Sequence, residues 1–424
     1  MKAILGFFLL SSFAFAEVHT LTLRQALDRA LEQNPDVLIS RLDENKARSQ
    51  VSIAKDPYSF KAGVGSGGAY TYGVPSSING NAPSVFRAQG SMTLFDRPQS
   101  YRVAQASENV RGASIDISIR QEEIAYRVYA AFLDAELAAR NAQVAEQLIS
   151  NLKEVKSYHE ARVAEGREHD LTIKQANLDI LRADKTVRDL KAAQDSAETS
   201  LGQLLAYAPG DQVHPALESR GLLTVPESQT AMAQAIAANL DIRRMESNIQ
   251  AKLLEVKSFD AGWLPKVNLI SDYSLLSKFN NFDTFYKKFQ RNNFQIGASI
   301  ELPLFQGRAT GAGRSQAEDD IAKMRIEIDR TRSRITADLK LAYSDVDRSE
   351  GDRQLAREDL NLAGDKIKLD LADYEEGRVP MAVVEASRAI EQQKWIAYYA
   401  AQKDVELARL NILRTTGGML ASLK

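Results

Sequence analysis

Glu165-Gly166-Arg167 lies in the middle of a region, Gln99 to Leu205, whose pattern predicts two very long helices joined by a tight turn. No proline occurs from the residue after Pro98 up to this turn. An unbroken helix of about 65 residues is roughly 100 Å long, whereas a compact globule of this chain length has a radius of gyration of about 22 Å. Such a helix must lie against other helices along its length, in a coiled coil or in the wall of a tube.

The chain repeats this region. An offset of 211 residues places Glu165-Gly166-Arg167 on Glu376-Gly377-Arg378, and it also places Gln105-Ala106 on Gln316-Ala317. One offset that holds over about a hundred residues without a gap indicates an internal duplication. Nearer the start of each copy the offset is 205, so the segments between have changed in length.

Small and apolar residues form two stripes on the predicted long helices. One stripe of the first copy consists of alanines at heptad spacing: Ala131, Ala135, Ala138, Ala142 and Ala145. In the second copy Leu355, Leu362 and Leu369 recur every seven residues beside a stripe that contains Leu360 and Asp370. Two stripes predict two helical neighbours and favour a closed ring of helices. A simple antiparallel coiled coil is the alternative.

Four segments alternate apolar with polar side chains, as strands with one apolar face do. They span about residues 60–74, 85–95, 265–275 and 293–304, and each is long enough for a tilted crossing of a bilayer. Four strands are too few to close a barrel, and open edges are costly in lipid. The sheet therefore either packs on helices in water or forms a barrel together with other copies of the chain, and the second interpretation is favoured.

The first sixteen residues resemble a secretory signal peptide, with Lys2, an apolar core, and Ala14-Phe15-Ala16 before the cleavage point. After this segment no apolar run is long enough for a membrane helix. The predicted domains are a signal peptide (1–16), a first repeat (17–206), a linker (207–226) and a second repeat (227–424). The formal charge of the 424 residues is −2 and the charges are interspersed, which argues against nucleic-acid binding.

Neither a catalytic nor a metal site is predicted. The chain has no cysteine, and the ten-residue spacing of His159 and His169 across a helix end is not a metal-ligand spacing. The glycine-rich run at 307–314 lacks the Gly-Lys-Ser/Thr of a phosphate-binding loop. We expect no enzymatic activity and no cofactor.

With these elements in order, the chain resembles the TolC-type outer-membrane efflux proteins. The motifs that carry the resemblance are Ser91-Met92-Thr93-Leu94-Phe95-Asp96, Leu302-Pro303-Leu304-Phe305-Gln306-Gly307, Tyr374-Glu375-Glu376-Gly377 and Val384-Glu385-Ala386. The resemblance covers essentially the whole mature chain. It implies a mainly α fold with β, built from duplicated β-β-α-α units. The long antiparallel helices would form a periplasmic α-barrel, and four strands per chain would contribute to a trimeric, 12-stranded transmembrane β-barrel.

The resemblance also implies a function and partners. A homotrimer in the lipid of the outer membrane, extending into the periplasm, would be a passive exit duct for efflux or type I secretion. It would dock a periplasmic adaptor protein and, through it, an inner-membrane pump of the RND, ABC or MFS type. Drug, metabolite and protein cargo all remain open. The alternative is a secreted or periplasmic structural coiled-coil protein with a small soluble sheet.

Two groups of residues match the family's functional positions. The helix turns that would dock the adaptor consist of these candidates: Glu165, Gly166, Arg167, Glu376, Gly377, Arg378, Val379 and Pro380. Asp170 and Glu385 are candidates for an acidic ring at the periplasmic aperture, although the family's earlier acidic place falls on Ala382 or Val383 here. Three copies of a carboxylate in a narrow pore would favour cations. The alternative for both acids is a solvated helix charge.

Overall fold

A computed structural model of the chain describes residues 17–67, 84–208, 210–217, 221–276, 292–305 and 307–422. The predicted signal peptide, most of the two loops between strands, and the end of the first predicted strand lie outside these residues. The chain divides into two units. The first comprises Met1–Ile39, Ser118–Leu240 and Arg332–Lys424, and the second comprises Ser40–Ile117 and Asp241–Thr331.

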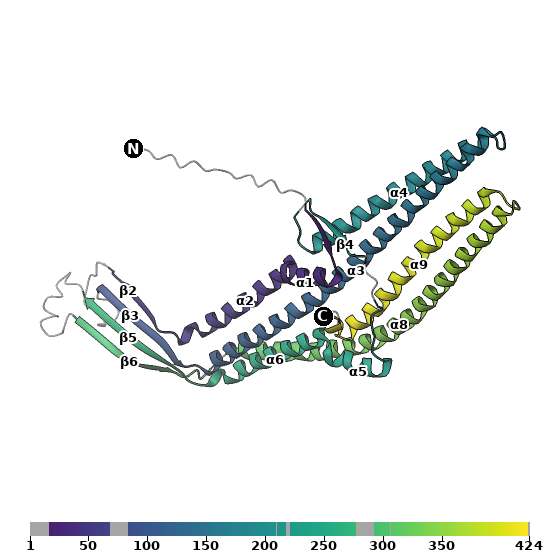
Figure 1. The fold of residues 1–424 in the computed structure, drawn as a ribbon. Coiled ribbons are helices and arrows are strands. Elements are labelled where there is room, and N and C mark those ends of the chain that lie inside the picture. Colours follow the sequence, from purple (N-terminus) through teal and green to yellow (C-terminus); the bar gives the residue numbers. More distant parts are fainter. Residues whose placement is uncertain are drawn as a thin grey trace, which may run out of the picture. The chain divides into compact units, whose positions relative to one another are not determined.

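Four long helices dominate the chain, and they pair as two antiparallel hairpins (Figure 1). Helices α3 (Arg97–Ala164) and α8 (Gly307–Glu375) contain 68 and 69 residues. Each is followed by a helix of 35 residues, α4 (Asp170–Leu204) and α9 (Met381–Thr415). Both ends of α9 lie 211 residues after the ends of α4, which is the offset found in the sequence.

Shorter helices precede the strands of each copy, and they repeat at the offset of 205 residues. They are α1 (Leu23–Gln33) and α2 (Pro35–Lys55), then α5 (Ser228–Ala238) and α6 (Leu240–Asp260). Helices α1 and α2 are separated at Asn34. Proline at the first position of α2 has no N–H to continue α1, and the Asn34 side chain accepts a hydrogen bond from the Asp36 amide at 2.9 Å. A short helix, α10 (Met419–Ser422), follows α9.

In the first unit the long helices form a layer in the order α4, α3, α9, α8. Lys191 of α4 lies 2.6 Å from Glu146 of α3, and Lys394 of α9 lies 2.5 Å from Asp359 of α8. The two hairpins meet where Lys403 of α9 contacts Asp134 of α3 at 2.9 Å. At the end of this layer distant from the turns, α1, α3, α4, α9 and α10 enclose one apolar core. Its largest fully buried side chains include Phe132, Ile124, Leu201, Leu205, Leu410 and Met419.

The predicted linker contains a strand that the sequence pattern did not indicate. Strand β4 (Gln212–Pro215) pairs in parallel with β1 (Val18–Leu21). Val213 of β4 is buried in the core of the first unit. This small sheet ties the segment between the two copies to the start of the described chain.

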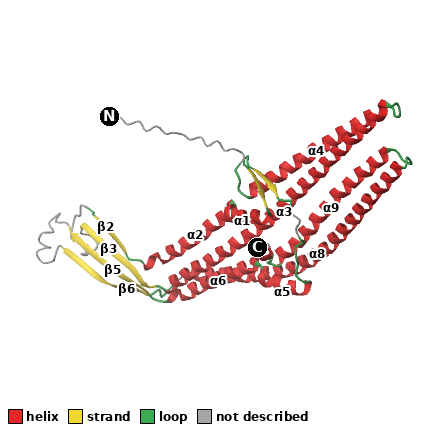
Figure 2. Cartoon of the chain, in the orientation of Figure 1, coloured by secondary structure: helices red, strands yellow, loops and turns green. Residues whose placement is uncertain are grey.

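The second unit holds a four-stranded antiparallel sheet, drawn in yellow in Figure 2. Its strands are β2 (Lys61–Gly65), β3 (Ser84–Phe95), β5 (Lys266–Leu276) and β6 (Asn292–Glu301), in the order β2-β3-β5-β6. The two copies therefore join through the pairing of β3 with β5, and β2 and β6 are the edges.

Helix α6 of the second unit joins the first part of α3 to the first part of α8. Arg244 of α6 lies 2.7 Å from Asp116 of α3, and Lys252 of α6 lies 3.0 Å from Asp320 of α8. The hydrogen bond to Asp320 raises the pKa of Lys252, so the Lys252 side chain stays positively charged at neutral pH.

Candidate functional site: the hairpin turns and the open edges

The two hairpin turns have the same backbone geometry. At the end of α3 the amide of Gly166 donates to the carbonyl of Val163 at 2.9 Å, and that of Arg167 donates to Arg162 at 2.9 Å. The corresponding bonds after α8 run from Gly377 to Tyr374 at 2.9 Å and from Arg378 to Asp373 at 2.8 Å. This is the Schellman arrangement, in which glycine at a positive φ ends the helix. The φ angles are 72° and 74°.

The turn residues predicted to dock a partner are mostly accessible. Of the eight candidates only Val379 is partly covered, and the others are exposed. Arg167 pairs with Glu165 at 3.3 Å, and Arg378 pairs with Asp373 at 3.2 Å. Both turns thus present an arginine beside acidic side chains on an exposed glycine turn.

The two aperture candidates lie in different surroundings. Asp170 is exposed and is the first residue of α4, whose N-terminal dipole favours a negative charge. The side chain of Glu385, on α9, is only 18% exposed and lies against His159 of α3. The structure therefore leaves Asp170 open to solvent and places Glu385 inside the contact between the two hairpins.

His159, which the sequence analysis considered only as a possible metal ligand, contacts two carboxylates in the structure. Its side chain is 10% exposed, with Nδ1 2.6 Å from a carboxylate oxygen of Glu168 and Nε2 3.4 Å from Oε1 of Glu385. Glu168 follows the first turn, whereas Glu385 belongs to the second hairpin. No sequence spacing indicates this triad, because Glu385 lies more than 200 residues from His159.

Burial alters the acidity of groups around this triad. Loss of hydration raises the pKa of Glu385, an effect that the nearby His159 and Arg388 oppose and Asp179 reinforces. Burial also raises the pKa of Tyr374 on α8 to about 12. Tyr374 packs edge-on against Tyr158, with ring centroids 5.9 Å apart, and Tyr158 accepts a hydrogen bond from Arg162 at 2.8 Å.

Apolar side chains are exposed on the two outer helices of the layer. On α8 the leucines at heptad spacing are open to solvent: Leu341 64%, Leu355 65%, Leu362 70% and Leu369 58%. On α4 the corresponding exposed residues are Leu171 67%, Leu178 42% and Leu181 61%. Each outer helix also has a buried stripe, which includes Leu360, Ala363 and Asp370 on α8. The stripe of leucines predicted on α8 is therefore present, and no other described helix of the same chain covers these side chains.

The strands of the second unit also expose apolar side chains. They include Val64 76%, Phe86 41%, Phe294 64%, Ile296 63% and Ile300 71%. Beside the sheet, where the strands give way to helices, Phe305 is 95% and Leu304 is 76% exposed. Exposed apolar patches of this kind mark surfaces that another molecule or lipid covers. Among the described helices none is long and apolar enough to cross a membrane.

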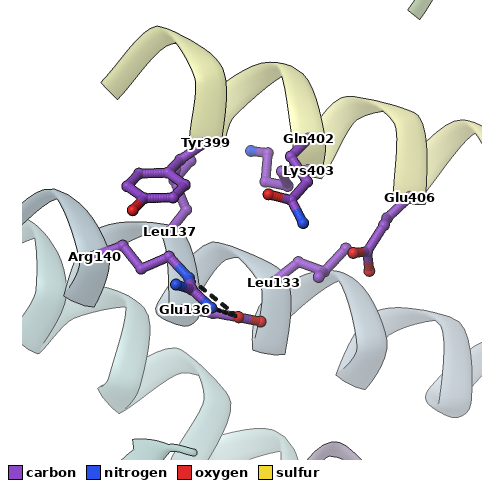
Figure 3. A pocket seen from close by; sticks show the side chains of 8 residues that line it. All are labelled: Leu133, Glu136, Leu137, Arg140, Tyr399, Gln402, Lys403 and Glu406. Atoms are coloured by element: carbon purple, nitrogen blue, oxygen red, sulfur yellow. Dashed lines mark hydrogen bonds and ion pairs between the residues drawn. The ribbon is translucent and has the colours of Figure 1, made fainter. Parts of the chain in front are cut away.

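A small cavity lies between α3 and α9. The residues drawn in Figure 3 line this cavity, among them Glu136 and Arg140 from α3 and Tyr399 and Lys403 from α9. Its volume is about 30 Å³. Arg140 donates a hydrogen bond of 2.8 Å to Glu136. A volume of this size holds one or two water molecules, whereas ligand pockets occupy about 300–1,000 Å³. In the described residues no cluster of His, Cys, Asp and Glu has the geometry of a metal site.

A family model described as outer membrane efflux protein matches residues 26–206 and 231–418. The chain belongs to the outer membrane efflux protein family. The matched ranges cover most of the sequence and leave the predicted signal peptide and the linker outside. The prediction of a TolC-type fold and of efflux at the outer membrane is thereby confirmed, and the alternative of a structural coiled-coil protein is set aside.

One relative and one solved structure match this efflux protein over most of its length. It is 24% identical over 414 residues to the outer membrane efflux protein BepC of Brucella suis, covering 94% of this chain and 86% of BepC. Among solved structures, the open state of the outer-membrane channel MtrE of Neisseria gonorrhoeae superposes with a TM-score of 0.72 at 16% identity, covering 94% of this chain and 89% of MtrE.

A second solved structure is similar in fold. The outer membrane protein VceC of Vibrio cholerae gives a TM-score of 0.69 at 15% identity, covering 93% of this chain and 96% of VceC. This efflux protein therefore has the fold of these outer-membrane channels, with its long helices and its four-stranded sheet. The family is one of channels rather than of enzymes.

Proposed function

We propose that three copies of this efflux protein form a passive exit duct, without enzymatic activity of its own. The four strands of each chain would contribute to a 12-stranded barrel in the outer membrane, and the long helices would form a tunnel through the periplasm. The observation that carries this proposal is that both layers of the chain have two open edges: α4 and α8 in the first unit, and β2 and β6 in the second.

The helical edges favour self-association. Exposed leucines at heptad spacing on α8 match the knobs that a neighbouring helix covers in a coiled coil. Burying one leucine stabilises an interface by about 1.5–3 kcal/mol. Because the two edges differ, a contact of α4 with α8 of another copy is heterologous, and such contacts close into rings when the rotation permits.

The sheet edges lead to the same arrangement. In lipid an unpaired N–H or C=O group costs several kcal/mol, and only closed barrels or helices satisfy all of them. Pairing β6 of one copy with β2 of the next removes both edges. Three copies reach twelve strands, which exceeds the roughly eight strands that a barrel requires.

The hairpin turns are the proposed docking surface for a periplasmic adaptor protein. The turns at Gly166 and Gly377 are both exposed, and each has an arginine beside acidic side chains. Every chain therefore offers an adaptor two similar sets of polar contacts. An inner-membrane pump joined through the adaptor would supply the energy, since the duct itself holds no cofactor in this proposal.

The aperture of the duct is proposed to be lined by Asp170 in preference to Glu385. Asp170 is exposed beside the first turn, whereas Glu385 is engaged by His159. Three symmetry-related Asp170 carboxylates would concentrate negative potential in a narrow pore and favour cations.

Crosslinking tests the assembly. The chain contains no cysteine, so Leu178→Cys on α4 and Leu369→Cys on α8 provide two unique thiols on opposite edges. Treating outer membranes with a short bifunctional thiol reagent should join α4 of one copy to α8 of the next and give a covalent trimer. Each single-cysteine variant is the control and should remain uncrosslinked. A double variant that gives only monomers or an open series of larger products would overturn the proposal.

A further inference from the structure

The contact of His159 with two carboxylates depends on a proton. Nδ1 lies 2.6 Å from a carboxylate oxygen of Glu168, a short contact that is favourable when Nδ1 carries the proton and the carboxylate accepts it. A neutral imidazole has one N–H, so with the proton on Nδ1 its Nε2 carries a lone pair. Nε2 faces Oε1 of Glu385 at 3.4 Å. This second contact is attractive only when one further proton is held by His159 or by Glu385.

The surroundings of Glu385 make that proton important. Its Oε1 is buried and makes no well-aligned hydrogen bond in the described structure. A buried carboxylate without a partner is costly, and facing a lone pair adds repulsion. Burial raises the pKa of Glu385 above its ordinary value of 4.5, which agrees with a site that holds a proton more firmly when the contact is closed.

The other charged groups facing the triad leave this dependence in place. Arg162 of α3 forms an ion pair with Glu168 at 2.7 Å. From α9, Arg388 opposes the rise in the pKa of Glu385, and from α4 Asp179 reinforces it. From α8, Tyr374 has a pKa of about 12 and stays neutral at physiological pH.

The contact lies beyond the last polar links between α3 and α9. Lys403 pairs with Asp134 at 2.9 Å, and the side-chain amide of Gln392 donates to the Val144 carbonyl at 3.2 Å. Toward the turns, the next polar link found among the described residues is that of His159 with Glu385. Breaking it would weaken the contact between the two hairpins beyond Val144, where the packing of Tyr158 on α3 against Tyr374 on α8 remains, while the core below stays intact.

We propose that His159 is a proton-dependent latch that joins the first hairpin to α9 of the second and opens as the pH rises. In the latched state one proton lies between Nε2 of His159 and Glu385. When that proton is lost to water, the lone pair and the carboxylate repel each other and the two hairpins separate near their turns. The inference concerns the position of the hairpins within one chain, so it stands apart from the proposed conduction.

Linkage gives the direction of the pH dependence. The latched state binds more protons than the open state, because burial in the closed contact raises the pKa of Glu385. Whichever state binds more protons loses relative stability as the pH rises. The latch should therefore be closed in mild acid and weaken above the ordinary carboxyl range.

A distance measurement within one chain tests the latch. Ala161→Cys on α3 and Ala382→Cys on α9 place two spin labels on exposed positions near the triad of an otherwise cysteine-free chain. Labelled protein is assembled with an excess of unlabelled protein, so that pulsed electron paramagnetic resonance reports distances within single chains. The measurement is made from about pH 5 to about pH 8, where histidine changes its charge.

We expect two distance populations whose ratio shifts toward the longer distance by roughly fivefold over this range, the size of a partly buried ion pair. His159→Gln and Glu385→Gln keep the hydrogen-bonding shape without the titration, so both should abolish the shift. His214→Gln is the matched control, because His214 also contacts a glutamate, Glu198 at 2.9 Å, away from the turns. This variant should retain the full shift.

Two results would overturn the proposal. One is a distance distribution that does not change with pH in labelled protein whose His159 and Glu385 are both intact. The other is a pH-dependent shift that persists in His159→Gln, since the titration would then lie elsewhere. A failure of the channel to conduct or to form trimers would leave these distances unaffected, so the latch and the proposed function fail separately.

Discussion

The same place in the two hairpins holds two different polar groups. His159 and Asp370 are separated by the 211-residue offset, and both are buried. Asp370 is held within its own hairpin, by Lys366 one turn away on α8 and by the hydroxyl of Ser387 on α9. His159 instead reaches out of its hairpin to Glu385. A duplicated scaffold has thus acquired one internal contact and one contact between hairpins.

The two contacts have opposite pH dependence. Lys366 and then Ser387 lower the pKa of Asp370 below its ordinary value of 3.8. The stabilisation from Asp370 is therefore present at neutral pH and is lost as the pH falls through its lowered pKa. Burial raises the pKa of Glu385, so its contribution is present in acid and is lost as the pH rises. The Asp370 contact therefore stabilises the second hairpin at neutral pH, whereas the contact of His159 with Glu385 between the two hairpins depends on a bound proton.

The largest effect is expected from a feature that both hairpins share, the exposed leucines on their outer helices α4 and α8. Leu362→Glu on α8 places a charge in the proposed interface with α4 of another copy, and we expect the trimer to be lost. The neighbouring exposed residue gives the control Asn361→Glu, which should assemble normally. Sedimentation in detergent measures both. A stable trimer of the Leu362→Glu variant would show that the α8 stripe is not an assembly surface.

Acid should loosen the second hairpin through Asp370. Protonating its carboxylate removes the ion pair with Lys366, so hydrogen exchange near the second turn should accelerate severalfold as the pH is lowered, after correction for the intrinsic rate. In Asp370→Asn this acid response should disappear. Residues near the first turn serve as the internal reference. An equal acid response in the Asn variant would assign the effect to another group.

Much of this architecture could be predicted because it is local. Proline and glycine punctuate the helices, and the alternating patterns of β3, β5 and β6 are long enough to recognise. The ends of α4 and α9 follow from the glycine turns and the single offset. The four-residue pair of β1 and β4 escaped prediction, since Val18 and Val213 provide too little alternation to stand out from a linker.

The latch escaped prediction for a different reason. The rotation of one hairpin against the other decides whether Glu385 faces a pore or a neighbouring helix, and heptad spacing leaves that rotation open. A motif match therefore placed Glu385 beside Asp170 as an aperture candidate, whereas packing against α3 brings it to His159. The signal available in the sequence was a histidine at a position where the other copy has an acid.

Asp170 should have a smaller effect, confined to ion selectivity, because its counterpart in the second copy is uncharged Met381. Asp170→Asn should lower the ratio of cation to anion permeability severalfold in planar bilayers, with little change in assembly. Asp189→Asn, which removes an exposed carboxylate farther along α4, is the control and should leave the ratio unchanged. Unaltered selectivity in the Asp170 variant would place the constriction elsewhere.

The smallest effect should be the same in both hairpins. Gly166 and Gly377 have φ angles of 72° and 74°, and an added Cβ would meet no atom within 4 Å at either position. Alanine therefore costs only the strain of the left-handed conformation, about 1 kcal/mol. Hydrogen exchange of the last turn of α3 in Gly166→Ala, and of α8 in Gly377→Ala, should accelerate by roughly fivefold, the equivalent of about 1 kcal/mol. A much larger response in Gly166→Ala alone would mean that the geometry of the first turn stabilises a contact that the second turn lacks. This is expected if the first turn also positions Glu168 against His159.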